Sequence, residues 1–195
     1  MNVFYKTIVL FVSVMLSGLA VADAYPNLGL NNDDNGKFSY IQMNDEYAMT
    51  AKHISTLKEH EYECSLGCDL VFFKHKNPKF ENGLWRAPVI KEEVAQIGIT
   101  HEGGIIIKMG EVTDEYTKPE KDSKFYNMST TSKTVKGMSG GPVYGADGKI
   151  IGMTIGAPKD RTEVKDVDSI FIPYEIIKLE WENFEKIKNL EPTKF

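Results

Sequence analysis

The chain has 195 residues, the length of about one domain. With 42% hydrophobic and 26% charged residues, its composition is that of an ordinary globular protein and excludes a disordered chain. Its 23 Lys and Arg residues against 28 Asp and Glu residues give a net charge of −5. Because nucleic-acid binders present basic surfaces to phosphates, this balance argues against a nucleic-acid partner.

Residues 1–22 have the pattern of a secretory signal peptide. Lys6 supplies a positive charge, an uncharged run follows as far as Leu19, and small residues precede a cleavage site after Ala22. A second candidate cleavage site lies two residues further on. The alternative is a retained membrane anchor, but the run of about 13 residues is too short to span a bilayer as a helix. We expect an exported, periplasmic or secreted protein, with residues 23–195 as a single domain and no stable membrane anchor after cleavage.

Short strands are predicted along most of the chain from Phe38 onward. Short hydrophobic runs alternate there with turn residues, as in proteins built from many short strands. The runs are residues 38–41, 46–50, 68–73, 94–100, 105–112, 142–144, 149–155 and 169–173. Glycine-containing turns predict two hairpins, one joining 94–100 to 105–112 and the other joining 142–144 to 149–155. Residues 113–124 are charged, and we expect them to form a solvent-exposed loop.

One amphipathic helix is predicted near the C-terminus. Apolar residues recur there at three- and four-residue spacings among Glu and Lys, on one expected face formed by Ile177, Trp181, Phe184, Ile187 and Leu190. Many short strands followed by one terminal helix favour a β-barrel or a β-sandwich. The sequence shows no internal repeat.

Cys64 and Cys68 are the only cysteines in the chain. In an oxidising compartment a local disulfide that closes a tight hairpin is one interpretation. Two free buried thiols are a second. A metal site is a third, because His60 precedes Cys64 at the same four-residue spacing, although no fourth ligand is near. We predict the disulfide, with no metal and no cofactor.

A serine among glycines is the strongest candidate for chemistry. The segment from Lys136 to Val143 reads KGMSGGPV and places Ser139 on a predicted tight turn. Glycines let the backbone turn so that amide N–H groups converge on one point, where they can stabilise the oxyanion formed when a serine attacks a carbonyl. A plain glycine-rich turn would also fit the segment alone.

The order of the acidic, histidine and serine residues separates the classes of serine hydrolase. All four histidines precede Ser139, whereas α/β-hydrolases place the histidine last, and the subtilisin fold needs helices that this sequence lacks. The order histidine, acid, serine remains. His53 ends one predicted strand and Asp69 begins another, where a carboxylate is costly to bury unless it is hydrogen-bonded. Asp114 and Asp122 are alternatives in the charged loop, where a carboxylate is merely solvated.

These segments resemble the motifs of the trypsin-like serine peptidases. The sequence TAKH at Thr50–His53 resembles their TAAH motif, GMSGGPV at Gly137–Val143 resembles their GxSGGPV motif, and DLV at Asp69–Val71 is similar to their D-[ILV]-A motif. The resemblance implies a short bacterial-type member of the family. Its fold would be all-β, with two antiparallel six-stranded β-barrels, the first one trimmed, a C-terminal helix, and the site in the cleft between the barrels.

The resemblance also implies a role for each residue of the site. Ser139 would attack the scissile carbonyl, His53 would take its proton and pass it to the leaving amine, and Asp69 would hold the imidazole. The backbone amides of Gly137 and Ser139 would form the oxyanion hole. Met138 stands where vertebrate trypsins carry the aspartate that receives a new N-terminal ammonium, so activation by that ion pair is excluded.

Two further segments would contact the substrate if the resemblance holds. Ile155, Gly156 and Ala157 would form the strand edge that pairs with the substrate backbone. Lys133 stands where the family often places the base of its primary specificity pocket, and Thr154 would line the same pocket. The alternative for Lys133 is a side chain that points to solvent.

The sequence therefore predicts a monomeric serine endopeptidase that acts on proteins or peptides without a cofactor. Two other hypotheses use the same fold. One is a catalytically inactive binding module, and the other is an esterase that uses the same three side chains on a non-peptide acyl group.

Overall fold

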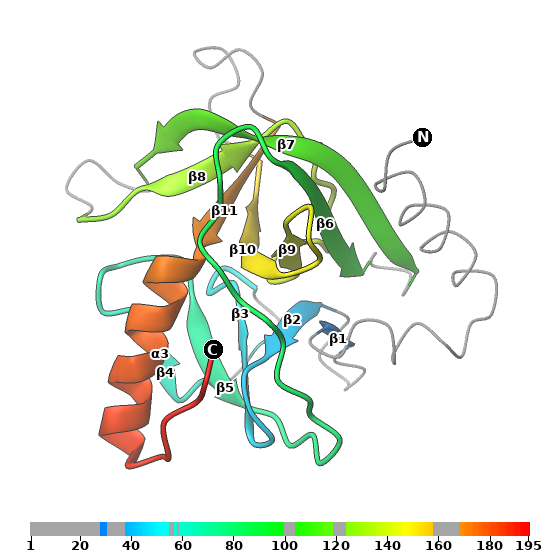
Figure 1. Cartoon of the computed structure of the whole chain (residues 1–195). Helices are drawn as coiled ribbons and strands as arrows, with labels where there is room; N and C mark the ends of the chain where they lie inside the picture. The colour runs from blue at the N-terminus through cyan, green and yellow to red at the C-terminus, as the bar shows by residue number, and fades with distance from the viewer. Residues whose placement is uncertain are drawn as a thin grey trace.

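The computed structural model describes residues 28–30, 38–54, 57, 59–99, 104–118, 124–157 and 168–195. The signal peptide predicted at residues 1–22 lies outside these residues. Within them the chain forms two β-sheets and one long helix, arranged as a barrel above a smaller sheet with the helix beside that sheet (Figure 1).

The first sheet has five strands and is antiparallel throughout. Its spatial order is β1-β2-β3-β5-β4. All residues of β2 and β3 are buried. One face of these strands packs on the helix, and the other contributes to a small cluster formed by Phe38, Tyr40, Ala48 and Phe73. The strands are β1 (Leu28–Leu30), β2 (Ser39–Gln42), β3 (Tyr47–Thr50), β4 (Tyr62–Glu63) and β5 (Val71–Lys74).

The second sheet closes on itself as a six-stranded barrel in the order β10-β11-β8-β7-β6-β9. Closure gives each strand a neighbour on both sides, but β9 pairs with β10 only as far as Met153, so the end of β10 extends past its partner. A loop was expected at residues 113–124, but β7 pairs with β8 as far as Thr117, so that prediction was wrong for residues 113–117. Residues 119–123 of the expected loop lie outside the described residues. The strands are β6 (Glu93–Ile99), β7 (Ile105–Thr117), β8 (Asn127–Thr130), β9 (Pro142–Tyr144), β10 (Ile150–Gly156) and β11 (Ser169–Pro173).

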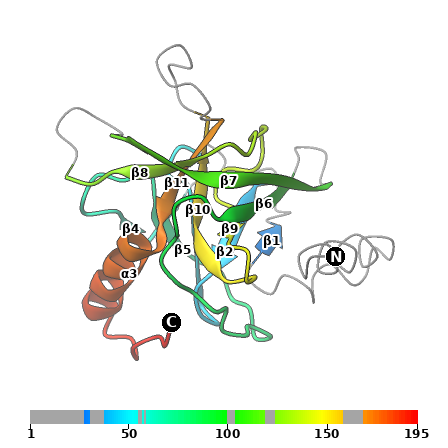
Figure 2. The ribbon, with the colours of Figure 1, turned by 45° about the horizontal axis from the view of Figure 1, so that its top comes forward.

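The helix α3 (Tyr174–Lys188) begins directly after β11 and lies beside β4 in both views (Figures 1 and 2). Its buried side packs on the first sheet: the rings of Trp181 and Phe72 lie 5.0 Å apart, as do those of Phe184 and Tyr47. The helix ends where Asn189 adopts a left-handed conformation, with φ of 54°. Of the predicted apolar face, Ile177, Trp181 and Phe184 are buried and Leu190 packs against the core from beyond the helix end, but Ile187 is 65% exposed, so its place on that face was wrong.

The predicted fold class is confirmed. The chain is all-β apart from the C-terminal helix, with one closed barrel and a trimmed first half that forms the five-stranded sheet. Sequence analysis missed three strands, β1, β4 and β8. All three are short, and β8 carries the polar sequence NMST although all four of its residues are buried.

Candidate active site

His53 and Asp69 are joined by two hydrogen bonds at the end of the first sheet. Past the end of β3, the buried Ala51 leads to His53, whose backbone N–H donates to Asp69 Oδ1 at 2.9 Å. The imidazole Nδ1 donates to Asp69 Oδ2 at 2.5 Å. The side-chain hydrogen bond to Asp69 raises the pKa of His53 above its ordinary value, because the carboxylate stabilises the imidazolium, while partial burial acts in the opposite direction. The pair therefore has the geometry of a base and its orienting acid.

Ser139 lies on a tight turn that is bound to the barrel strand β10. The N–H of Met138 closes the turn on the carbonyl of Val135 at 3.2 Å, and Gly137 has a φ of 99°, which few residues with a Cβ adopt. After the serine, the N–H of Gly140 donates to the carbonyl of Thr154 at 2.8 Å. These bonds fix the backbone on both sides of Ser139.

The serine turn also packs tightly against the first sheet. A Cβ on Gly140 would lie 2.1 Å from the hydroxyl oxygen of Thr50 and 2.2 Å from the carbonyl oxygen of Ser39, so only glycine fits. The hydroxyl of Ser39 donates to the carbonyl of Gly137 at 2.7 Å, and the hydroxyl of Thr50 donates to the carbonyl of Ser39 at 2.8 Å. The two halves of the molecule thus meet at the serine turn.

The hydroxyl of Ser139 donates to the carbonyl oxygen of Ile155 at 2.7 Å. In the part of the chain that the structure describes, no hydrogen bond joins Ser139 to His53. The structure therefore brings His53 together with Asp69, and Ser139 together with β10. Formation of a Ser139–His53 hydrogen bond requires the hydroxyl to leave Ile155.

The amides around the serine alternate between bonded and free. The N–H of Met138 bonds Val135, and the N–H of Gly140 bonds Thr154. Among the described residues, neither the N–H of Gly137 nor that of Ser139 has a hydrogen-bond partner. Two free donors separated by one residue on a tight turn are suited to binding a single anionic oxygen.

Comparisons with known proteins agree with this architecture. No family model and no curated protein matches the sequence. Among solved structures, an inactive serine-to-alanine mutant of Rv3671c from M. tuberculosis is 13% identical, with a TM-score of 0.64 over 93% of this chain and 96% of that chain. The serine endoprotease from Yersinia pestis is 18% identical, with a TM-score of 0.60 over 86% of this chain and 65% of that chain.

A third structure, the MamO protease domain from Magnetospirillum magneticum, is 16% identical, with a TM-score of 0.61 over 85% of this chain and 95% of that chain. The chain has the trypsin-like serine protease fold. In this trypsin-like chain, His53 and Asp69 flank strands of the first sheet, whereas Ser139 precedes a strand of the barrel. The serine turn contacts Ser39 and Thr50 of the first sheet, so the two sheets meet at this turn.

Four of the five residues predicted to contact substrate lie on β10 of the trypsin-like barrel or directly after it. Thr154 is fully buried, and its hydroxyl oxygen has no partner among the described residues. Ile155 is buried, and its carbonyl accepts from the catalytic serine candidate. A register shift separates Thr154 from Gly156, and Ala157 beyond it is exposed. Lys133 is exposed on the segment between β8 and the serine turn.

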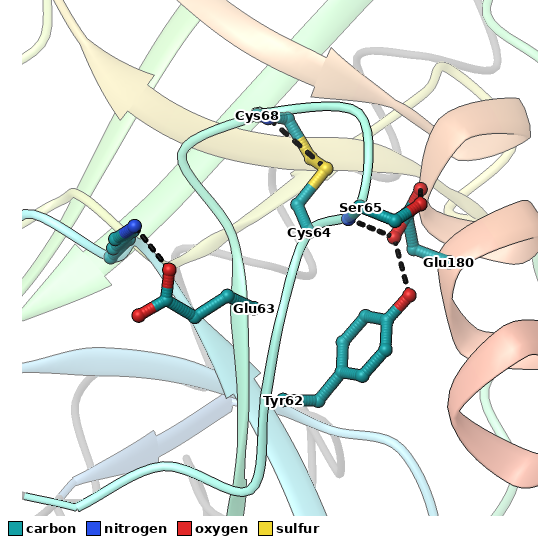
Figure 3. The surroundings of a disulfide bond; sticks show 7 residues. Tyr62, Glu63, Cys64, Ser65, Cys68 and Glu180 are labelled. Atoms are coloured by element: carbon teal, nitrogen blue, oxygen red, sulfur yellow. Dashed lines mark hydrogen bonds and ion pairs between the residues drawn. A yellow bond between two sulfur atoms is a disulfide. The ribbon is translucent and has the colours of Figure 1, made fainter. Parts of the chain in front are cut away.

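The predicted disulfide between Cys64 and Cys68 is present, with Cα atoms 5.4 Å apart (Figure 3). The alternatives of free thiols and of a metal site were wrong, because both sulfurs are used in the bond and His60 Nε2 bonds Glu63 Oε1 at 2.8 Å. Across the described ranges no group of His, Cys, Asp and Glu residues is arranged to hold a metal ion. No helix in those ranges has the length and apolar character needed to cross a membrane.

Sequence analysis missed a buried carboxylate next to the disulfide. Glu180 of α3 is fully buried and bonds Tyr62 and Ser65. Its signal was readable: Glu180 is three residues after Ile177 and four before Phe184, which places a charge on the apolar face of the helix.

Proposed function

We propose that the protein is a serine endopeptidase with His53, Asp69 and Ser139 as its catalytic triad. The observation that carries the proposal is the doubly hydrogen-bonded His53–Asp69 pair. Because Asp69 accepts the proton on Nδ1, the neutral imidazole keeps a lone pair on Nε2, the atom that a general base needs. One oxygen of Asp69 holds the ring and the other holds the backbone N–H of His53, so the carboxylate orients the imidazole as a catalytic acid would.

In the proposed mechanism the Ser139 hydroxyl turns from Ile155 to His53 Nε2. His53 takes the hydroxyl proton as the oxygen attacks the peptide carbonyl, and then gives that proton to the leaving amine. Asp69 stabilises the imidazolium formed between the two steps. The free amides of Gly137 and Ser139 support an oxyanion hole, in which each donor contributes about 10²- to 10³-fold in rate.

The substrate is proposed to be a protein or peptide that pairs with the backbone from Ile155 to Ala157. An extended peptide adds to an exposed strand by main-chain hydrogen bonds. A substrate N–H would take the carbonyl of Ile155 and displace the hydroxyl of Ser139, so binding would free the nucleophile. The disulfide supports export, since such bonds persist in oxidising compartments.

An inactive binding module is the second candidate, and the Ser139–Ile155 hydrogen bond is the observation that favours it. If the hydroxyl never leaves Ile155, the fold would bind peptides without cleaving them. The two candidates differ in whether Ser139 reacts as an activated nucleophile.

The test is labelling by a fluorophosphonate, which reacts with activated serines, followed by intact mass measurement. Wild type should gain one adduct, while Ser139→Ala and His53→Ala should gain none. His60→Ala is the matched control, because this histidine bonds Glu63 and lies outside the proposed triad. Absence of an adduct on folded wild type would overturn the peptidase proposal. For a reactive protein, hydrolysis of peptides rather than simple esters separates a peptidase from an esterase.

A further inference from the structure

Glu180 is a buried carboxylate that receives three hydrogen bonds from one segment of the first sheet. Its Oε2 accepts from the hydroxyl of Tyr62 at 2.8 Å and from the N–H of Ser65 at 2.7 Å, and its Oε1 accepts from the hydroxyl of Ser65 at 2.8 Å (Figure 3). Among the described residues no cation forms an ion pair with it. Neutral donors alone compensate its burial.

Such an arrangement is sensitive to the loss of any one partner. An ionised carboxylate is costly to remove from water, and only well-placed hydrogen bonds offset that cost. The backbone N–H of Ser65 is one of the donors, so the carboxylate binds the main chain of the segment and not only a side chain. Glu180 therefore constrains where residue 65 lies relative to α3.

Ser65 lies inside the short loop closed by the Cys64–Cys68 disulfide, and Asp69 is the first residue after Cys68. The N–H of Cys64 donates to the carbonyl of Leu70 at 3.0 Å, and the N–H of Leu70 donates to the carbonyl of Cys68 at 2.9 Å. These bonds, with the disulfide, make residues 64–70 one cross-linked unit. A displacement of Ser65 would carry Asp69 with it.

We propose that Glu180 is a positioning residue, which holds the disulfide-closed loop at residues 64–68 against α3 and thereby sets the carboxylate of Asp69 against His53. The proposal rests on the proposed function for its catalytic meaning. The geometric part, the placement of Asp69, does not depend on turnover.

The first test is Glu180→Gln, followed by NMR titration of the His53 imidazole and by fluorophosphonate labelling across pH. Glutamine keeps the size of the side chain but replaces one acceptor oxygen by an NH₂ donor, which leaves a single acceptor oxygen for the three donors of Tyr62 and Ser65. The loop should shift, the pKa of His53 should fall toward its ordinary value, and the labelling rate at its high-pH plateau should drop about 10- to 100-fold.

Glu185→Gln is the matched control. Glu185 is a second buried glutamate on the same helix, but its Oε1 accepts from the N–H of Thr193 in the C-terminal tail at 2.7 Å. This change should lower the melting temperature and leave both the His53 titration and the labelling rate unchanged. A merely structural role for Glu180 would give the same result as the control.

Ser65→Ala provides a milder second variant in case Glu180→Gln does not fold. It removes one of the three hydrogen bonds and keeps the backbone donor, so it should shift the His53 titration in the same direction by a smaller amount. If Glu180→Gln folds, the proposal is overturned when that variant leaves the pKa of His53 and the labelling rate at wild-type values. If only Ser65→Ala folds, the same result for Ser65→Ala overturns it. If wild type is never labelled but the His53 titration shifts in the variant, Glu180 still positions Asp69 and the peptidase proposal fails.

Discussion

The hydroxyl of Ser139 donates its hydrogen bond to the carbonyl oxygen of Ile155, at 2.7 Å, and not to His53. The acceptor belongs to the strand that we propose as the docking edge for a peptide. The nucleophile and the substrate backbone therefore compete for one carbonyl group. This competition predicts how binding responds when the hydroxyl is removed.

Ser139→Ala should abolish turnover and tighten peptide binding. The substitution frees the carbonyl of Ile155, and a net hydrogen bond of about 1 kcal/mol corresponds to a few-fold change in Kd. Fluorescence anisotropy with a labelled peptide checks the change. The wild-type comparison uses a peptide with a non-cleavable backbone. Weaker binding by the alanine variant would show that Ser139 assists docking.

The pH dependence of labelling should follow the raised pKa of His53. The reaction needs neutral imidazole, so the rate should increase with pH through a midpoint above the ordinary value of about 6.5. The hydrogen bond between the charged imidazole and Asp69 also stabilises the folded protein, and this contribution falls as pH rises, whereas the labelling rate increases. The contribution is fully present below the unfolded-state pKa and is lost as pH rises through the folded-state value.

Asp69→Asn tests the origin of that shift. The variant removes the negative charge and offers the imidazole a different tautomer, so the midpoint should move down and the plateau rate should fall, by about 10⁴-fold in the limit set by other serine proteases. A rate profile identical to that of wild type would exclude Asp69 from the triad. Thermal melting of both proteins shows whether the variant is folded.

Gly140→Ala should disrupt the serine turn much more than Gly148→Ala. Both glycines have positive φ, of 87° and 79°, but the new Cβ would meet the hydroxyl oxygen of Thr50 at 2.1 Å in the first case and nothing within 4 Å in the second. A positive φ costs an alanine about 1–2 kcal/mol by itself, and Gly148→Ala measures that cost without a steric clash. Unfolding in urea should therefore show a larger loss of free energy for Gly140→Ala than for Gly148→Ala. Only Gly140→Ala should also lose fluorophosphonate labelling.

Phe184→Ala and Ile187→Ala should separate the buried and exposed sides of α3. Phe184 is fully buried between the rings of Tyr47, Phe72 and Trp181, so its truncation should cost about 3–5 kcal/mol. Ile187 is 65% exposed, and its truncation should change the unfolding free energy by about 0.5 kcal/mol or less. Equal losses would mean that Ile187 packs against the core.

Local sequence accounted for much of the site and of the fold. The glycines around Ser139 predicted the tight turn because positive φ is a local property of the backbone. Alternation and three- to four-residue spacing predicted most strands and the helix, since burial of one face repeats with the period of the element. The order of His53, Asp69 and Ser139 excluded other hydrolase folds, because each fold places its three catalytic side chains in its own order along the chain.

Non-local contacts decided the features that sequence analysis missed. Inside the barrel, the hydroxyl of Thr130 in the polar strand β8 bonds Ser169 of β11, which also bonds Gln96 of β6, and these three strands meet only when the barrel closes. Glu180 and Ser65 are 115 residues apart in the chain.

The sequence by itself indicated the candidate residues for the proposed chemistry and the local conformations they adopt, because those depend on residue type and on the nearest neighbours. The tertiary structure alone decided that both oxygens of Asp69 face His53, that the Ser139 hydroxyl points to Ile155, and that the disulfide loop is bound to α3. Each of these depends on which acceptor or donor the fold brings within about 3 Å, and that choice is made between segments far apart in the chain.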